Sequence, residues 1–131
     1  MNLDDYREIQ RFSAGRVAAD APTRVVLDGK TELPRVAQAV YVAYSPDDVC
    51  LYVGSTRRSG RRGAVERRLA EHDRKISRWR TWGRLEIVPI VDGVLLHEVR
   101  SIEGYTGMLL RPTQNSRLPR VITLEPMTLV G

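Results

Sequence analysis

Two tyrosines and an arginine–histidine pair are the residues whose types and spacing best suit chemistry in this sequence. Tyr41 and Tyr52 each sit in a short apolar run, and a polar turn joins the two runs. Further on, Arg68 and His72 are four residues apart in a helical pattern, so their side chains point the same way. A phenol with its ordinary pKa of about 10 is a poor base, but neighbouring cations can lower that pKa. We therefore expect the chemistry to lie within residues 39–72.

Each of these polar residues also has a purely structural interpretation. Periodicity allows His72 to be either a site residue or a half-buried histidine with a backbone partner. Arg68 could lie on a solvated helix flank, although its neighbour there is a histidine rather than a carboxylate. Cys50 lies in a strand pattern, which favours a small apolar filler over a nucleophile. One cysteine and two histidines cannot form a zinc cluster.

Positive charge is concentrated in one part of the chain. Residues 57–84 hold eleven Lys or Arg against three acids, a net +8, whereas the rest holds ten basic and thirteen acidic residues. Such a segment on a mildly acidic chain is typical of proteins that bind a phosphate backbone. The alternative is a solvated helix face with pairs such as Glu71–Lys75, but it leaves most of the charge unpaired. The residues expected to contact DNA are Arg57, Arg58, Arg61, Arg62, Arg67 and Lys75.

The elements that must position these residues are short strands and helices. Apolar spacing predicts a helix over 3–19 and a short strand over 25–27. The runs that contain Tyr41 and Tyr52 predict a β-hairpin, in which alternation puts Tyr41 and Ala43 on one face of the sheet. Val40, Val42 and Tyr44 would then line the other face.

The second half of the chain predicts a helix, a strand and another helix. The first helix runs over 64–79, and the strand over 85–91 contains Pro89, which suggests an edge or bulge position. The final helix follows an Asp-Gly turn and contains Gly104 and Gly107. Each glycine costs a helix about 1 kcal/mol relative to alanine, so close packing against another element would explain both.

These elements predict an α/β (α+β) fold with a small, mostly antiparallel, three-stranded central sheet flanked by helices. We divide the chain into an N-terminal extension over 1–37, a domain over 38–118 and a tail over 119–131. The length suits one modest core. The sequence has no apolar run of eighteen residues and an acidic N-terminus, so we expect no membrane span and no signal peptide. The single cysteine fits a cytoplasmic protein.

An ordered series of residues runs through the predicted domain. It begins with Ala39-Val40-Tyr41, continues after ten residues with Tyr52-Val53-Gly54-Ser55 and then Arg68-Leu69 with His72, and ends with Glu103 and Asn115. Two tyrosine triplets alone occur by chance in many strands, whereas the whole ordered set is much more specific. The series resembles the GIY-YIG nuclease superfamily over about residues 38–118, with Ala39 in place of the first glycine of its motif.

The resemblance implies a metal-dependent endonuclease that hydrolyses phosphodiester bonds. Glu103 would hold one divalent cation, Mg²⁺ or Mn²⁺, with water and phosphate oxygens as most of its other ligands. Arg68 would grip the scissile phosphate, and Tyr41 would orient the attacking water or accept its proton. The other three residues would bind phosphate or form supporting hydrogen bonds. The implied catalytic residues are Tyr41, Tyr52, Arg68, His72, Glu103 and Asn115.

The expected partner is double-stranded DNA. Two other functions stay open at this point, a DNA-binding module without catalysis and a basic RNA-binding domain. Few aromatic residues, among them Trp79 and Trp82, are available to stack on bases, which weighs against single-stranded RNA. No zinc finger or helix-turn-helix pattern is evident, so specificity would come from residues 1–38, the arginine-rich loop, a homodimer or another protein. We expect no membrane partner.

Overall fold

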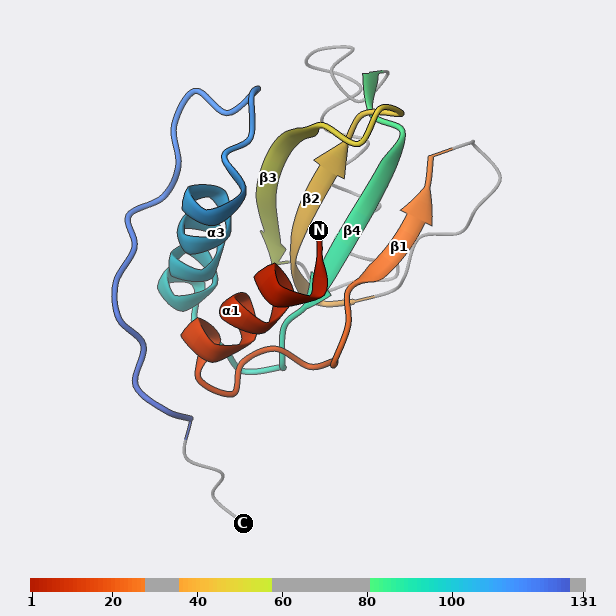
Figure 1. Ribbon diagram of the computed structural model, residues 1–131. Coiled ribbons are helices and arrows are strands. Elements are labelled where there is room, and N and C mark those ends of the chain that lie inside the picture. Colours follow the sequence, from red (N-terminus) through yellow and green to blue (C-terminus); the bar gives the residue numbers. More distant parts are fainter. Residues whose placement is uncertain (28–35, 58–80, 128–131) are drawn as a thin grey trace.

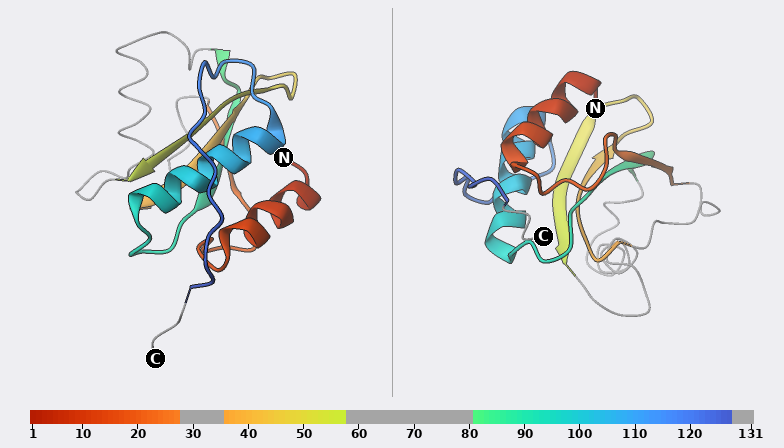
Figure 2. Two further views of the ribbon diagram at one scale, coloured as in Figure 1. Left: turned by 90° about the vertical axis from the view of Figure 1, so that its left-hand side faces the viewer. Right: turned by 90° about the horizontal axis from the view of Figure 1, so that it is seen from below.

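The computed structural model describes residues 1–27, 36–57 and 81–127. These residues form two helices and four strands, which in chain order are α1 (Leu3–Ser13), β1 (Thr23–Val26), β2 (Gln38–Tyr44), β3 (Cys50–Arg57), β4 (Arg84–Pro89) and α3 (Leu96–Leu110). Both helices lie on the same face of the sheet, and the chain after α3 runs along the outer side of that helix (Figures 1 and 2). No helix in these described ranges is long and apolar enough to cross a membrane.

The sheet has four antiparallel strands in the order β1-β4-β2-β3, so the expectation of three strands is wrong. The additional strand is β1, which comes from the N-terminal segment and pairs with β4. Consequently β4 is an internal strand, and Pro89 is its last residue rather than an edge residue. Pro89 is opposite Ala39 on β2, but the neighbouring Ile90 donates its N–H to Gln38 on that side, so by alternation the nitrogen of Pro89 faces the β1 side. Proline is tolerated there because the pairing with β1 has already ended at Ile87.

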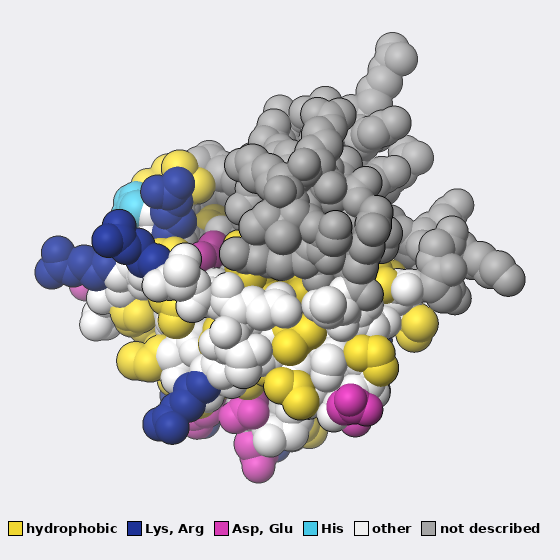
Figure 3. Space-filling model, turned by 90° about the horizontal axis from the view of Figure 1, so that it is seen from above, with side chains coloured by type: hydrophobic (Ala, Val, Ile, Leu, Met, Phe, Trp, Pro, Cys, Tyr) yellow, Lys and Arg dark blue, Asp and Glu magenta, His cyan; other side chains and the backbone are white. Residues whose placement is uncertain are grey.

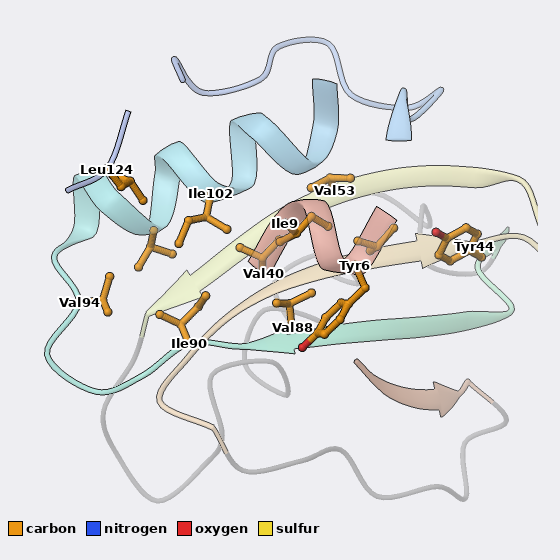
Figure 4. Close-up of a cluster of buried hydrophobic side chains, with 12 residues drawn as sticks. Tyr6, Ile9, Val40, Tyr44, Val53, Val88, Ile90, Val94, Ile102 and Leu124 are labelled. Carbon is orange, nitrogen blue, oxygen red and sulfur yellow. The ribbon is translucent and has the colours of Figure 1, made fainter. Parts of the chain in front are cut away.

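The two faces of β2 separate two apolar clusters, as the alternation predicts. On the helix side, β2 contributes Val40 and Val42 to a core that also contains Tyr6 and Ile9 of α1 (Figure 4). Both α1 side chains are fully buried, and burying such a side chain contributes about 1.5–3 kcal/mol. The N-terminal helix therefore belongs to the same core as the hairpin. On the opposite face, the cluster consists of Val25, Ala39, Tyr41, Ala43, Trp82, Leu85 and Ile87.

The first helix is shorter than predicted. The Asn2 side chain accepts a hydrogen bond from the Asp5 backbone N–H at 2.8 Å, so α1 begins with a side-chain cap. The helix ends at Ser13 rather than continuing to residue 19, because Ala14 takes a left-handed conformation with φ of 51°. Gly15 follows with φ of 93°, a conformation that glycine adopts without strain. The chain then turns back toward the sheet.

The glycines of α3 make room for the chain that follows the helix. A Cβ at Gly107 would lie 2.5 Å from the Leu118 side chain, and one at Gly104 would collide with the carbonyl oxygen of Pro119. One turn earlier, the Ser101 hydroxyl bonds both the carbonyl oxygen of Ile122 at 2.7 Å and its N–H at 2.8 Å. The prediction that these glycines permit close packing is confirmed.

A largely buried ion pair joins the chain just after α1 to the start of α3, and its arginine also binds the tail. The Arg16 guanidinium donates to Glu98 Oε2 at 2.6 and 3.0 Å, and to the carbonyl oxygen of Glu125 at 2.6 Å. The other oxygen of Glu98 accepts the Leu95 N–H at the start of α3. Burial by itself would raise the pKa of Glu98, but the Leu95 N–H and Arg16 together lower it below the ordinary value for glutamate.

This ion pair predicts a specific loss of stability in acid. Because the pKa of Glu98 is lower in the folded than in the unfolded protein, its charge stabilises the fold above the unfolded pKa of about 4.3. That contribution disappears as the pH falls through the lower, folded value. Replacing Glu98 with Gln should cost about 3 kcal/mol at pH 7, because Arg16 stays buried without its anion.

Urea unfolding of both proteins between pH 7 and pH 3 measures the effect. The difference in unfolding free energy should shrink toward acid pH, and a constant difference would contradict the assignment. Glu8→Gln is the matched control, since Glu8 forms an exposed pair with Arg11 and its loss should change stability little.

Candidate functional site

The structure describes four of the six predicted catalytic residues. Tyr41 lies on β2, Tyr52 on β3, Glu103 on α3 and Asn115 in the chain that follows α3. Arg57 is the last residue of β3. The remaining predicted residues lie outside the described ranges, and they are Arg58, Arg61, Arg62, Arg67, Arg68, His72 and Lys75.

Tyr41 packs directly over Gly54. The two residues are register partners in the β2–β3 pair. A Cβ at Gly54 would lie 2.5 Å from Tyr41 Cζ, even closer to the Tyr41 hydroxyl oxygen, and 2.9 Å from Tyr52 Cε1. Contacts this short exclude any side chain, so glycine at this position lets the phenol lie against the backbone of β3. Tyr41 is only 1% exposed as a result.

The two tyrosines belong to a row of three rings on the sheet face opposite the helices. The ring centroids of Tyr41 and Tyr52 are 6.1 Å apart, and those of Tyr52 and Trp82 are 5.5 Å apart. The interplanar angles are 28° and 24°, so each pair is stacked. Tyr41 and Trp82 are buried, whereas Tyr52 between them is half-buried. The row limits how far either phenol can move.

The Glu103 side chain contacts β3 from the helix side of the sheet. Ser55 directly follows Gly54, and its hydroxyl donates a hydrogen bond to Glu103 Oε1. Because side chains alternate along a strand, Ser55 faces α3 on the same side as Val53. The carboxylate of Glu103 is half-buried and held in one orientation by this bond. Sequence reasoning missed this role of Ser55, for which the only signal was its place after Gly54.

Asn115 binds the backbone of β3 two residues before Ser55. Its side-chain oxygen accepts the Val53 N–H at 2.9 Å, and its side-chain nitrogen donates to the Val53 carbonyl oxygen at 2.9 Å. The preceding residues Thr113 and Gln114 donate their backbone N–H groups to carbonyl oxygens of Cys50 and Leu51. This segment therefore covers part of the exposed edge of β3, where unpaired backbone groups would otherwise remain.

The donor set at Glu103 is compatible with one hard cation. Among residues 1–27, 36–57 and 81–127, no group of three or more His, Cys, Asp or Glu is placed to hold a metal ion. From this part of the chain, a cation at Glu103 would have one carboxylate and would take its other ligands from water and phosphate. Mg²⁺ commonly binds in this way, because it retains several waters and uses one or two carboxylates.

Two other reactive groups in the described chain have structural roles. Burial raises the pKa of the Cys50 thiol to about 11, which supports its interpretation as an apolar filler rather than a nucleophile. Glu86 is 1% exposed and forms ion pairs with the amino group of Met1 at 2.5 Å and with Arg84 at 3.0 Å. Sequence reasoning missed this buried carboxylate, which lies inside an apolar strand pattern and has the distant Met1 amino group as one of its partners.

Comparison of the chain with protein-family models, curated proteins and solved structures finds no significant match. Function must therefore be inferred from the chain's own residues and their contacts.

The Tyr41–Gly54 contact predicts that even the smallest side chain at position 54 is harmful. Gly54→Ala should destabilise the protein by about 1–3 kcal/mol, because the added methyl group collides with the phenol and forces it away. Urea unfolding measures the cost. In a Tyr41→Leu background the same substitution should cost clearly less, because the two nearest colliding atoms, both of the Tyr41 phenol, are gone and only Tyr52 remains close. Equal costs in both backgrounds would show that the strain lies elsewhere.

Proposed function

We propose that this protein is a metal-dependent DNA endonuclease of the GIY-YIG type. The observation that carries the proposal is the meeting of three distant segments at residues 52–55 of β3. Tyr41 lies over Gly54, Glu103 accepts a hydrogen bond from Ser55, and Asn115 binds the backbone of the preceding residue, Val53. A phenol and an oriented carboxylate are thereby held at two consecutive residues of the edge strand β3, the phenol on the face opposite the helices and the carboxylate on the helix face.

The proposed reaction is hydrolysis of a phosphodiester bond. A bond forms between a water oxygen and phosphorus, while the bond from phosphorus to the leaving oxygen breaks. The Tyr41 hydroxyl orients the water and, when ionised, accepts its proton. Glu103 holds Mg²⁺ or Mn²⁺, and a bound cation would neutralise charge on the phosphate and on the leaving oxygen. Ser55 keeps the Glu103 carboxylate turned toward β3.

The remaining predicted residues act on the phosphate in this proposal. Arg68 grips the scissile phosphate through its forked donors, and His72 and Tyr52 bind phosphate or adjust the pKa of Tyr41. The geometry of Arg68 and His72 stays a prediction, since both lie outside the described residues.

Double-stranded DNA is the proposed substrate because positive charge begins next to the site. The basic segment starts at Arg57, three residues after Gly54 and so within roughly 10 Å of it along the strand. Arginine side chains also gather on one side of the molecule in Figure 3. The exposed arginines of α3 and of the chain after it are Arg100, Arg111, Arg117 and Arg120. Such a distribution favours binding to a polyanion.

The first test concerns the carboxylate. The native protein should nick or linearise supercoiled plasmid with Mg²⁺ or Mn²⁺ and leave it intact in EDTA. Glu103→Gln removes the negative charge at nearly constant shape, so cleavage should fall on the order of 10²-fold or more, the scale of losing a metal ligand. DNA binding should persist, because a carboxylate near a phosphate opposes binding.

Glu125→Gln is the matched control, because Glu125 is an exposed glutamate in the chain after α3. This variant should cleave DNA like the native protein. Native cleavage by Glu103→Gln would remove Glu103 from the site. If the native protein binds DNA but cleaves none with either cation, the protein is a DNA-binding module without catalysis.

The second test separates the two tyrosines. Tyr41→Phe keeps the ring over Gly54 but removes the hydroxyl, so the protein should fold and bind DNA while the rate falls about 10²-fold or more. Tyr52→Phe keeps both stacking contacts and should lose less, because a phosphate hydrogen bond contributes less than a general base.

Single-turnover cleavage across roughly pH 6 to 10, a range below and around the ordinary pKa of a phenol, measures both variants. The native rate should rise as the phenol ionises, and this rise should be absent in Tyr41→Phe. Near-native rates for Tyr41→Phe would leave the phenol a packing role only, and a larger loss for Tyr52→Phe would exchange the two roles.

A further inference from the structure

Gln114 connects three segments that are far apart in the sequence. Its backbone N–H donates to the carbonyl oxygen of Leu51 on β3 at 2.7 Å. Its side-chain oxygen accepts the indole N–H of Trp82 at 3.0 Å, and its side-chain nitrogen donates to the Thr81 hydroxyl at 3.3 Å. An indole nitrogen can only donate, so the amide oxygen must be the atom that faces it. Gln114 therefore has a defined orientation between the edge of β3 and the residues just before β4.

The indole that Gln114 holds is one end of the ring row. Trp82 is 3% exposed and stacks on Tyr52, which in turn stacks on Tyr41. A buried indole N–H without an acceptor is unfavourable, so loss of the Gln114 oxygen would favour a different rotation of the indole. Because Tyr52 lies between two rings, a rotated indole would no longer offer the same surface to it.

We propose that Gln114 is a positioning residue for the tyrosine pair. Its amide oxygen sets the plane of Trp82, and Trp82 sets the plane of Tyr52 beside Tyr41. The next residue, Asn115, holds the backbone of β3, so two consecutive side chains hold the strand and the rings that lie on it. The effect on catalytic rate rests on the proposed nuclease function, whereas the effect on ring geometry does not.

Three variants separate the acceptor from the side chain as a whole. Gln114→Glu keeps an oxygen that can accept the indole N–H, whereas Gln114→Met has a similar length and no such acceptor. Gln10→Met is the matched control, because Gln10 is also half-buried and loses one side-chain hydrogen bond, to the carbonyl oxygen of Ala19 on the α1 side of the molecule.

Two readouts are measured for each variant. The first is the NMR resonance of the Trp82 indole N–H, assigned with Trp79→Phe, together with the nuclear Overhauser contacts between the Trp82 and Tyr52 rings. The second is the single-turnover cleavage rate at saturating plasmid DNA with Mg²⁺. In Gln114→Met the indole resonance should shift, the ring contacts should weaken and the rate should fall about 10-fold, the scale of a small misplacement. Gln114→Glu and Gln10→Met should keep the native ring contacts and the native rate.

A double substitution tests the order of the chain of contacts. Trp82→Phe removes the indole N–H and keeps a stacking ring, so Gln114→Met should lower the rate no further in that background. A further 10-fold loss there, or native ring contacts in Gln114→Met alone, would overturn the proposal. The proposal would also be overturned if Gln114→Met lost the ring contacts but still cleaved DNA at the native rate.

The two proposals fail separately. If the native protein cleaves no DNA, the nuclease function is wrong, and the ring contacts alone decide the role of Gln114. Their loss in Gln114→Met and retention in Gln114→Glu would then support positioning of the ring row, and their retention in both variants would overturn it.

Discussion

The close approach of the Tyr41 ring to the backbone at Gly54 is the constraint on which the candidate site depends. A glycine in a strand normally weakens it, because it adds no packing and has more conformational freedom to lose on folding. Here the missing side chain is the space that the phenol occupies. The phenol is consequently held at one point of β3, between the backbone and the neighbouring ring of Tyr52. Gly54 therefore lowers the intrinsic stability of the strand, but it gives the Tyr41 hydroxyl a fixed position. A flexible loop would not hold a polar group as well.

The edge position of β3 lets groups from both faces of the sheet meet on one strand. An internal strand has neighbours on both sides, but β3 pairs only with β2 among the described strands. Its other side is therefore available to the chain that follows α3. Asn115 satisfies the Val53 backbone there as a neighbouring strand would, and Glu103 reaches Ser55 from the helix above. Part of an edge that would otherwise favour aggregation is covered by residues 113–115, which include the candidate site residue Asn115.

The N-terminal segment and the tail stabilise the helices that carry these groups. α1 packs against α3 through the stacked rings of Phe12 and Tyr105, and β1 extends the sheet beyond β4. The chain after α3 packs closely against the two glycines of that helix, and Ser101 binds it through two hydrogen bonds. The position of Glu103 on α3 is thus determined by contacts outside the hairpin. The N-terminal segment and the tail therefore hold the helix that carries Glu103.

The sequence by itself determined the features that depend on local order. Alternation of side chains along a strand has a period of two residues, so the hairpin and the opposite faces of Val40 and Tyr41 could be predicted correctly. Gly104 and Gly107 likewise indicated a close contact, although not with which segment. Whether the ordered motif residues make this chain a nuclease stays a prediction.

Only the tertiary structure decided which distant segments meet. The pairing of β1 with β4 made a fourth strand and put Pro89 at the end of an internal one. The tertiary structure likewise decided that Gln114 binds the indole at one end of the ring row and that Glu86 is a buried carboxylate paired with Met1. Each of these includes a contact between residues more than thirty positions apart, such as Trp82 with Gln114 and Met1 with Glu86. Such contacts leave no periodic signal in the sequence, because their free energy depends on three-dimensional proximity rather than on neighbours along the chain.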